Sequence, residues 1–443
     1  MKNPTKSLGA VFSQVSKTHT NARFHWKNLL SATIFVGLSA SSSLAAAKDS
    51  ELVITNIRVG QGDATLIQGP IIDGKRVNVL FDAGNISGLD GGNILNAVLR
   101  KNGVRSLDYF VVSHDDADHL GGAVFGGTKS NPKLHGRSFI LGPNNVAGCP
   151  GDDDKDGITD WITKEYIPDP EEIGPCDDVA VKNFVDYGEK NMRETLSIKK
   201  YNAMANTIGK RHTIADQKAV NSFQIDLGNN AKMVAYAGNG YVRNGKGKRD
   251  KAATSPNERS LAFLVTYGDF DFLIAGDLIG KQGLSCNKKT GKWTTSNSSS
   301  TDAKMETALG KALAKSKRRI DVLHVNHHGA DNGSSSEFLN LIKPNIAIIS
   351  AGNGNSHEHP KLETLERLYA ASVYQIIQTS WGTTEKMIPG KIRYRQAIYQ
   401  NDIVIKSTGI GYSVGTSRYY DSDKNYVPKN LKESEIPVSP CDA

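Results

Sequence analysis

The chain has 443 residues, of which 38% are hydrophobic and 23% charged, and a formal net charge of +8. This is the composition of a globular protein, and the length allows one large core or two modest ones. Residues 1–47 hold five of the 54 basic residues and none of the 46 acidic ones, which leaves a charge of +3 on the rest. Bulk charge therefore gives no argument for DNA binding.

Residues 1–47 have the order of a secretory signal peptide. A long basic region precedes the apolar run 29–38, and three alanines, 45–47, follow it. The apolar run is short for a membrane span, so an uncleaved anchor is the weaker alternative. We expect export to the periplasm or the medium, and no transmembrane segment in the mature chain.

Export to an oxidising compartment makes disulfides plausible for the four cysteines. They allow three pairings, and none belongs to a CxxC motif. We favour Cys149–Cys176, because this pair brackets one compact acidic segment, which leaves Cys286–Cys441 by default.

Residues 48–142 alternate strand-like runs with turns. We expect strands at 53–57, 63–67, 77–81 and 108–113, and a helix at 94–100. The last of these strands leads into the segment 113–122, Ser-His-Asp-Asp-Ala-Asp-His-Leu-Gly-Gly. Imidazole and carboxylate groups crowded at the end of a buried strand are typical of a metal site.

Residues 143–200 interrupt this rhythm and are predicted to form an acidic surface insertion. Their carboxylates at 152–160 have the spacing of a calcium loop, with Gly157 at the sharp turn. The candidate calcium ligands are Asp152, Asp154, Asp156 and Asp160. Thr163 stands where an EF-hand would have glutamate, so the loop is not an EF-hand. The alternative is a solvated acidic loop. Calcium and the Cys149–Cys176 bridge would order this insertion.

Residues 201–420 return to regular structure, and 421–443 form a tail. We expect a mobile basic loop at 240–256, a hairpin from 261–267 and 270–274, strands at 320–325 and 346–350, and a helix at 362–371. Closing strands are expected at 402–405 and 411–414. Potential ligands again follow the strands, at Asp277, His327 with His328, and His357 with His359.

Potential ligands that follow several predicted strands indicate that these side chains meet on one face of an α/β fold. Two metal ions about 3.5–4 Å apart would need about this many ligands, with one carboxylate shared between them.

The order of the motifs resembles the metallo-β-lactamase superfamily. It is most similar to the hydrolase domain of the ComEC-type DNA-uptake proteins and their free-standing relatives. The motifs are Val59–Asp63, Phe81–Gly84, Ser113–Gly122, Ile274–Asp277 and His327–Gly329, with further similarity at 257–261 and 355–360. The resemblance spans about 52–142 and 220–415 and implies an αββα sandwich with a metal site at one edge of two facing sheets.

The resemblance also implies a ligand set. His114 and Asp116 would bind one transition-metal ion, and Asp118 and His119 a second. Asp277 would bridge both ions. His327 would be a further ligand, with His328 as the fallback.

Three positions depart from the family pattern. Asp116 replaces a common histidine, which makes Mn²⁺ as plausible as Zn²⁺. The usual histidine between the first cluster and Asp277 is absent, and we assign Asn257 and Ser260 in that region to substrate binding. Arg58 stands where related proteins usually have aspartate.

The resulting expectation is a secreted phosphodiesterase or nuclease that uses a metal-activated hydroxide. Asp118 would be essential, and His357 or His359 would donate a proton or bind an oxyanion, unless they only cap the structure. Small esters, lactones or β-lactams are alternative substrates, because one fold hosts many reactions. A non-catalytic extracellular calcium-binding module is the remaining alternative.

Overall fold

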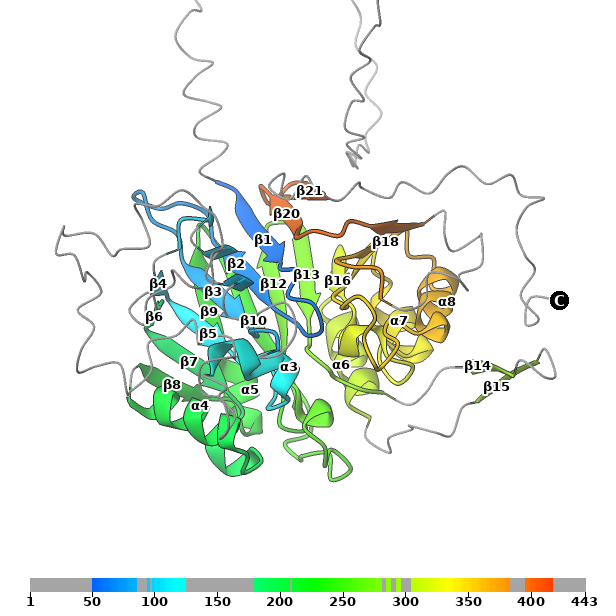
Figure 1. The fold of residues 1–443 in the computed structure, drawn as a ribbon, viewed down its shortest axis with the longest axis horizontal. Helices are drawn as coiled ribbons and strands as arrows, with labels where there is room; N and C mark the ends of the chain where they lie inside the picture. The colour runs from blue at the N-terminus through cyan, green and yellow to red at the C-terminus, as the bar shows by residue number, and fades with distance from the viewer. Residues whose placement is uncertain are drawn as a thin grey trace, which may run out of the picture.

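The computed structural model describes residues 50–85, 94–95, 98–99, 101–104, 106–124, 179–207, 209–280, 304–382 and 395–416, and the backbone of 284–287 and 292–295. Two large mixed sheets face each other, with helices outside them (Figure 1). The predicted signal peptide, the calcium loop, the tail and the cysteine side chains lie outside the described residues.

The first sheet has the order β21-β20-β1-β2-β3-β5-β7-β8. Its strands β1, β2 and β3, at three of the predicted strand positions, form an antiparallel meander, and β3, β5, β7 and β8 run parallel. The strands are β1 Leu52–Asn56, β2 Thr65–Gln68, β3 Asn78–Phe81, β5 Tyr109–Val111, β7 Asn183–Asp186, β8 Lys210–Thr213, β20 Ile403–Ser407 and β21 Tyr412–Thr416.

The second sheet has the order β11-β10-β12-β13-β16-β17-β18-β19, and β9 also pairs with β10. The predicted β12–β13 hairpin is present, and β13 and the four strands after it run parallel. The strands are β9 Gln224–Gly228, β10 Ala231–Gly238, β11 Tyr241–Val242, β12 Ala262–Tyr267, β13 Phe270–Ile274, β16 Val322–His324, β17 Ile346–Ile349, β18 Gln375–Gln378 and β19 Gln396–Ile398.

Two small sheets and several helices complete the described part. The small sheets pair β4 Ser106–Leu107 with β6 Ala180–Val181, and β14 Leu284–Asn287 with β15 Lys292–Thr295. The α-helices are α3 Ala117–Leu120, α4 Leu196–Thr207, α5 Gln217–Ser222, α6 Met305–Lys315, α7 Ser336–Ile342 and α8 Leu362–Ala370. The 3-10 turns are η1 Gly121–Ala123, η3 Glu189–Asn191, η4 Asn257–Arg259 and η5 Asn326–Gly329.

Side-chain alternation along the strands builds the layers, because neighbouring residues of a strand point to opposite faces. Phe81 of β3 meets Phe263 of β12 edge to face, with ring centroids 6.2 Å apart, and so joins the inner faces of the two sheets. Phe110 of β5 points the other way and packs against Tyr201 of α4 at 6.3 Å. Helix α4 therefore covers the outer face of the first sheet.

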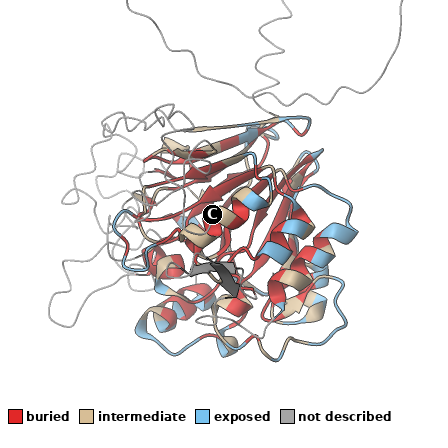
Figure 2. Ribbon diagram, turned by 90° about the vertical axis from the view of Figure 1, so that its right-hand side faces the viewer, coloured by how far each residue is buried: buried red, intermediate tan, exposed pale blue. Residues whose placement is uncertain are grey.

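The second sheet is covered in the same way. Leu264 and Leu273 alternate with inward residues of β12 and β13, and they share an apolar cluster with α6, α7 and α8. Figure 2 shows the strands buried and the outward helix faces exposed. The layers are thus α, β, β, α, as the family resemblance implies. No helix in the described residues has both the length and the apolar character needed to span a membrane.

One predicted boundary is wrong. The insertion was expected to extend from 143 to 200, but β7 lies inside the first sheet between β5 and β8. Phe184 and Val185 supply the core residues of this strand. The strand β7 was not predicted, because two or three apolar residues among polar ones show too little periodicity to indicate a strand.

Candidate metal centre

Two pairs of parallel strands, one pair in each large sheet, end at the same edge of the sandwich, and polar residues follow each strand. Asp82 follows β3 and His114 follows β5, both in the first sheet. Asp277 follows β13, and the η5 turn follows β16, both in the second sheet. Ligand sites in open α/β sheets lie at such carboxyl ends of strands.

The turn between β1 and β2 brings a further carboxylate, Asp63, to this edge. The backbone N–H of Asp63 donates to the carbonyl oxygen of Asp118 at 3.1 Å. Gly62 has a φ of +122°, and a Cβ there would lie 2.2 Å from the same oxygen. Only glycine permits this approach, because it alone tolerates both the contact and the backbone angle.

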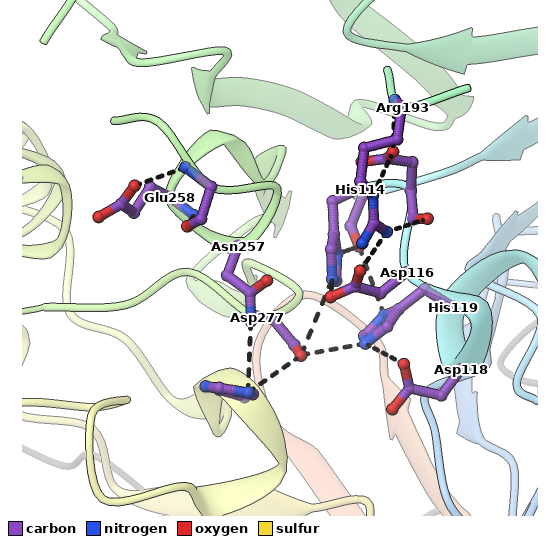
Figure 3. Close-up of polar contacts among 12 residues, drawn as sticks. His114, Asp116, Asp118, His119, Arg193, Asn257, Glu258 and Asp277 are labelled. Atoms are coloured by element: carbon purple, nitrogen blue, oxygen red, sulfur yellow. Dashed lines mark hydrogen bonds and ion pairs between the residues drawn. The ribbon is translucent and has the colours of Figure 1, made fainter. Parts of the chain in front are cut away.

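Asp63, His119, Asp277 and His328 form the centre of the site. All four are buried, and one ligand atom from each lies within 4.8 Å of the others. Figure 3 shows the Asp277 carboxylate facing His114 and His119, with Asp116 next to His114 and Asp118 next to His119.

One group of side chains surrounds Oδ1 of Asp277. Nε2 of His119 lies 3.1 Å from this oxygen, and Nε2 of His328 lies 3.5 Å from it. The two Nε2 atoms are 3.2 Å apart. Oδ2 of Asp118 lies 3.3 Å from Nε2 of His328. We call His119, His328 and Asp118 the Oδ1 group.

A second group surrounds Oδ2 of Asp277. Nε2 of His327 lies 3.6 Å from this oxygen and Nε2 of His114 lies 3.8 Å from it. Oδ2 of Asp116 is 3.3 Å from the same His114 nitrogen. We call His114, His327 and Asp116 the Oδ2 group. A single carboxylate thus faces two separate pairs of histidines, one pair on each oxygen.

The two groups differ in what lies behind their histidines. In the Oδ1 group, Nδ1 of His119 lies 2.8 Å from the Asp82 carboxylate, and Nδ1 of His328 lies 3.3 Å from that of Asp63. In the Oδ2 group the partners are neutral: Ser113 Oγ for His114 and Asn332 Oδ1 for His327. A carboxylate behind a histidine fixes the ring and makes it a stronger metal ligand.

Three residues at this edge have a strained backbone. Asp82, His327 and His328 all have positive φ, between 51° and 58°, although none is glycine. Left-handed residues of this kind cost of order 1 kcal/mol each and gather at functional sites. The strained η5 turn lets two adjacent histidines each direct Nε2 at a different oxygen of Asp277.

Opposite charges outweigh burial in setting the ionisation of the centre. Burial disfavours protonated His119, but the carboxylates of Asp277 and Asp82 raise its pKa well above the usual value. Asp277 and Asp63 raise the pKa of His328 in the same way. Burial likewise opposes ionisation of Asp277, yet the neighbouring histidines hold its pKa well below the usual range. The carboxylates therefore stay ionised and attract positive charge.

The residues fit a divalent metal ion. Nε2 of His114, Oδ1 of Asp277 and both carboxylate oxygens of Asp63 are buried and form no hydrogen bond with a described residue. At most one proton fits between the facing Nε2 atoms of His119 and His328, whereas a metal ion accepts lone pairs from both. Mixed imidazole and carboxylate donors suit Zn²⁺, Mn²⁺ or Fe²⁺.

Comparison with known proteins gives short matches. No protein-family model matches the chain. An 85-residue segment, 19% of this chain, is 34% identical to ComE operon protein 3 of Bacillus subtilis (strain 168) and covers 10% of it. A 68-residue segment, 15% of this chain, is 38% identical to Recombination protein 2 of Haemophilus influenzae and covers 8% of it. The chain thus matches about a tenth of the length of either relative.

One solved structure, described as a metal-dependent hydrolase of the β-lactamase superfamily, covers 74% of this chain at 12% identity, with a TM-score of 0.35. That score is too low to establish a common fold. More informative are the motif order, partial homology to these two relatives and a buried His/Asp centre at the edge of an αββα sandwich. These observations show partial homology to the two relatives and a motif order similar to that of the metallo-β-lactamase superfamily.

The structure brings together six sequence-predicted ligands: His114, Asp116, Asp118, His119, Asp277 and His327. His328, the fallback, lies closer to the centre than His327 does, and each contacts a different oxygen of Asp277. The sequence posed the two as alternatives, whereas the turn at η5 places both at the site.

The predicted proton donors lie beside the centre. His359 is buried, and its ring centroid is 5.5 Å from that of His327 and 5.9 Å from that of His328. Burial and the charge of His328 lower the pKa of His359 to about 3. His359 is therefore neutral at pH 7 and can donate a hydrogen bond, but it carries no extra proton to give. His357 is exposed, and its ring is tilted against that of His359 with the centroids 5.5 Å apart.

The predicted substrate residues have different surroundings. Nδ2 of Asn257 lies 3.3 Å from Nε2 of His327, so this amide contacts a candidate ligand directly. Ser260 is buried, and its Oγ has no hydrogen-bond partner among the described residues. Of the two predicted substrate residues, Asn257 is thus the one that lies against His327.

Sequence reasoning missed several residues of the site. Asp63 was assigned to a strand, although it closes the Val-Gly-Gln-Gly-Asp motif. His324 looks like an ordinary strand residue, yet its Nε2 lies 3.5 Å from Asp63. Asp115 and Arg193 form an ion pair at 2.9 Å beside Asp116. Arg193 could not be placed, because only the tertiary fold brings it across 77 residues to this edge.

Proposed function

We propose that this chain is a metal-dependent hydrolase that holds two divalent ions and cleaves phosphodiester bonds. The observation that carries the proposal is the position of Asp277, whose two oxygens face separate histidine pairs. One ion would be held by the Oδ1 group and a second by the Oδ2 group, with Asp277 between them. Ions bound there supply Lewis acidity and make water acidic enough to ionise near neutral pH.

The exposure of the ligands indicates how substrate reaches the site. His114, His119 and His328 are fully buried, whereas the side chains of Asp116, Asp118 and His327 are 27%, 22% and 20% exposed. The open side of the centre is therefore the side of these three residues. The buried histidines would hold the ions on the inner side, and substrate would approach from the solvent in front of Asp116, Asp118 and His327.

The surrounding residues orient the ligands and exclude water. Asp82 and Asp63 keep His119 and His328 in place, and Asn257 contacts His327. Neutral His359 closes the centre next to the η5 histidines and can donate a hydrogen bond to an oxygen that gains negative charge. Asp116 in place of a histidine makes the Oδ2 group richer in oxygen, which favours Mn²⁺ beside Zn²⁺.

Nucleic acid is the substrate that we propose first. Lys246, Lys248 and Lys251 are exposed on the segment between β11 and η4, and this segment leads directly to Asn257. The name of the Haemophilus relative, Recombination protein 2, points to DNA for that protein. Lysines on a segment that leads to Asn257 would bind the phosphate backbone of a nucleic acid without reading its sequence.

A substrate screen tests the proposal. Protein loaded with Mn²⁺ or Zn²⁺ is offered single- and double-stranded DNA, RNA, bis-p-nitrophenyl phosphate and a chromogenic β-lactam, with Asp277→Asn as the matched inactive control. We expect metal-dependent cleavage of at least one phosphodiester that the variant lacks. Turnover of the β-lactam alone would refute the phosphodiester assignment, and no turnover of any substrate by metal-loaded protein would refute the hydrolase.

We further propose export of the chain and calcium binding at residues 152–160. Both rest on sequence patterns in segments outside the described residues. Cell fractionation with N-terminal sequencing tests the first, since a mature start near residue 48 is expected. Calcium-dependent protection of the 143–178 segment from proteolysis tests the second, and equal cleavage with calcium and with chelator would contradict it.

A further inference from the structure

Arg193 lies at the rim of the metal centre and is held there from two directions. Its Nε donates to Oδ2 of Asp115 at 2.9 Å, and its backbone N–H donates to the same oxygen at 2.8 Å. Its Nη2 donates to the backbone oxygen of Asp115 at 2.6 Å and also to Oδ1 of Asp116. Figure 3 shows Arg193 extending to Asp116 beside His114.

Asp115, which holds Arg193, is itself buried and hydrogen-bonded. The Asp115 side chain is 1% exposed, and the hydroxyl of the buried Tyr187 donates to its other oxygen. The Arg193 side chain, by contrast, is 49% exposed. Nη1 of Arg193 has no acceptor among the described residues. The guanidinium is therefore fixed on its inner side and open to solvent on its outer side.

Asp116 connects the guanidinium to the centre. Its Oδ2 faces Nε2 of His114 at 3.3 Å, while its Oδ1 accepts the hydrogen bond from Arg193. A metal ion on the His114 side and the arginine on the other side can use the same carboxylate at once. Arg193 thus lies one carboxylate away from the candidate metal position, on the open face of the site.

The charge of the site explains why a cation is needed there. The centre gathers the carboxylates of Asp63, Asp82, Asp116, Asp118 and Asp277. Among the described residues, the ion pairs of these carboxylates are with histidines, except for the pair between Asp116 and Arg193. Arg193 carries a permanent positive charge, because a guanidinium group stays protonated in proteins.

We propose that Arg193 binds a non-bridging phosphate oxygen of the substrate and so selects phosphodiesters over neutral esters. The proposal rests on the proposed phosphodiesterase function. A guanidinium offers several N–H donors in a plane and binds phosphate oxygens through charge-assisted hydrogen bonds. The outer nitrogen of Arg193 faces solvent next to the open carboxylates, where a phosphate oriented by the ions would place an unshared oxygen.

A purely structural role for Arg193, as a clamp on Asp115, makes a different prediction. Tyr187→Phe removes a hydrogen bond to Asp115 but leaves the Arg193 charge in place, so it serves as the matched control. If Arg193 acts only as a clamp, Arg193→Gln and Tyr187→Phe change the same properties, namely metal content and thermal midpoint. If Arg193 binds phosphate, only the arginine variant changes phosphate affinity.

The test uses the Mn²⁺-loaded full chain with bis-p-nitrophenyl phosphate as substrate and inorganic phosphate as inhibitor. For Arg193→Gln we expect KM and the phosphate inhibition constant to rise about tenfold or more, the size of a lost charge-assisted hydrogen bond, with metal content unchanged. Arg193→Lys keeps the positive charge but loses the planar guanidinium. Its KM and phosphate inhibition constant should therefore lie between those of the unsubstituted protein and of Arg193→Gln. Tyr187→Phe should leave the phosphate inhibition constant within about twofold of the unsubstituted protein.

The outcomes separate the inference from the function. An active unsubstituted protein whose phosphate inhibition constant is the same in Arg193→Gln overturns the role of Arg193 alone. An unsubstituted protein that neither cleaves the phosphodiester nor binds phosphate overturns the proposed function. Should Arg193→Gln fail to fold, Arg193→Lys decides, because an unchanged phosphate inhibition constant in that variant also contradicts the inference.

Discussion

Protons and metal ions compete for the same nitrogens at the level of single residues. His119 and His328 have raised pKa values because Asp277 lies between them and a second carboxylate lies behind each ring. A metal ion binds only the deprotonated Nε2, so binding must release the protons that these rings hold at pH 7. The carboxylates that favour metal binding therefore also stabilise the protonated histidines, and protons compete with the metal ion.

This competition fixes the sign of the pH dependence. A raised histidine pKa stabilises the metal-free fold fully below pH 6.5, and this stability is lost as pH rises through the folded-state pKa. We expect the thermal midpoint of chelated protein to fall above neutral pH, while metal-loaded protein keeps its midpoint. Apparent metal affinity should rise over the same range. Thermal melts between pH 6 and 9, with and without Mn²⁺, check this; a metal-free midpoint that rises with pH would contradict it.

At the scale of elements, two turns decide whether the ligands meet. The turn at 57–64 carries Asp63 against helix α3, and the η5 turn carries His327 and His328 between β16 and α7. The first turn buries Ile57 and Val59 in the core, and in both turns close backbone contacts or buried polar anchors set the positions of the ligands.

The first turn depends on Gly62. Alanine there would place a Cβ 2.2 Å from the Asp118 carbonyl oxygen at a φ of +122°. We expect Gly62→Ala to lower the free energy of unfolding by about 3 kcal/mol or more and to weaken metal binding, because α3 must move. Gly74→Ala is the control, since its φ of +75° is also positive but its Cβ would meet nothing within 4 Å. Equal losses in the two variants, measured by urea unfolding, would rule out the contact as the cause.

The η5 turn depends on Glu306 of α6. Its buried carboxylate accepts hydrogen bonds from the backbone N–H of Ser334 and Ser335 and from Nδ2 of Asn326. Glu306→Ala leaves these donors unpaired, and we expect a loss of about 3 kcal/mol in unfolding free energy. Metal affinity should fall as well, because Asn326 directly precedes the two histidines.

Glu337→Ala removes an exposed carboxylate on α7 and is the control for this variant, with an expected change within about 0.5 kcal/mol. Calorimetric melting and metal titration of both variants give the comparison. Unchanged metal affinity in a destabilised Glu306→Ala protein would show that the anchor holds the helices but not the ligands.

At the scale of the whole molecule, the apolar runs of the sequence predicted the main strands, and the family resemblance implied the αββα layers. The candidate ligands were found where three of these predicted strands end, namely β5, β13 and β16. What the sequence could not predict are contacts between distant segments. Asp63 behind His328, Arg193 across from Asp116 and the strand β7 each depend on pairings that no local pattern records.

The ambiguity between His327 and His328 has the same origin. Adjacent residues in a regular strand point to opposite sides, so the sequence allowed only one of them at the site. The left-handed backbone at both residues removes that limit. Such strained angles follow from the tertiary fold and cannot be inferred from local propensity.

The basic segment before η4 makes a prediction about the molecule as a whole. If Lys246 and Lys248 contact the backbone of a nucleic acid, replacing both with alanine should weaken DNA binding at low salt and reduce the slope of log affinity against log salt by up to about two. Lys311→Ala with Lys315→Ala on α6 is the control pair. Fluorescence anisotropy at several salt concentrations measures both, and equal slopes in the two double variants would remove this segment from the binding surface.

The account depends most on Asp277 as a ligand shared between two ions. The direct measurement is the number and affinity of Mn²⁺ and Zn²⁺ ions bound by chelator-treated protein, by calorimetry and elemental analysis, for the unsubstituted chain, Asp277→Asn and Asp116→Asn. We predict two ions in the first, loss of both or affinities lowered more than about 100-fold in Asp277→Asn, and one retained in Asp116→Asn. No bound transition metal in the unsubstituted chain, or two ions still tightly held by Asp277→Asn, would contradict the account.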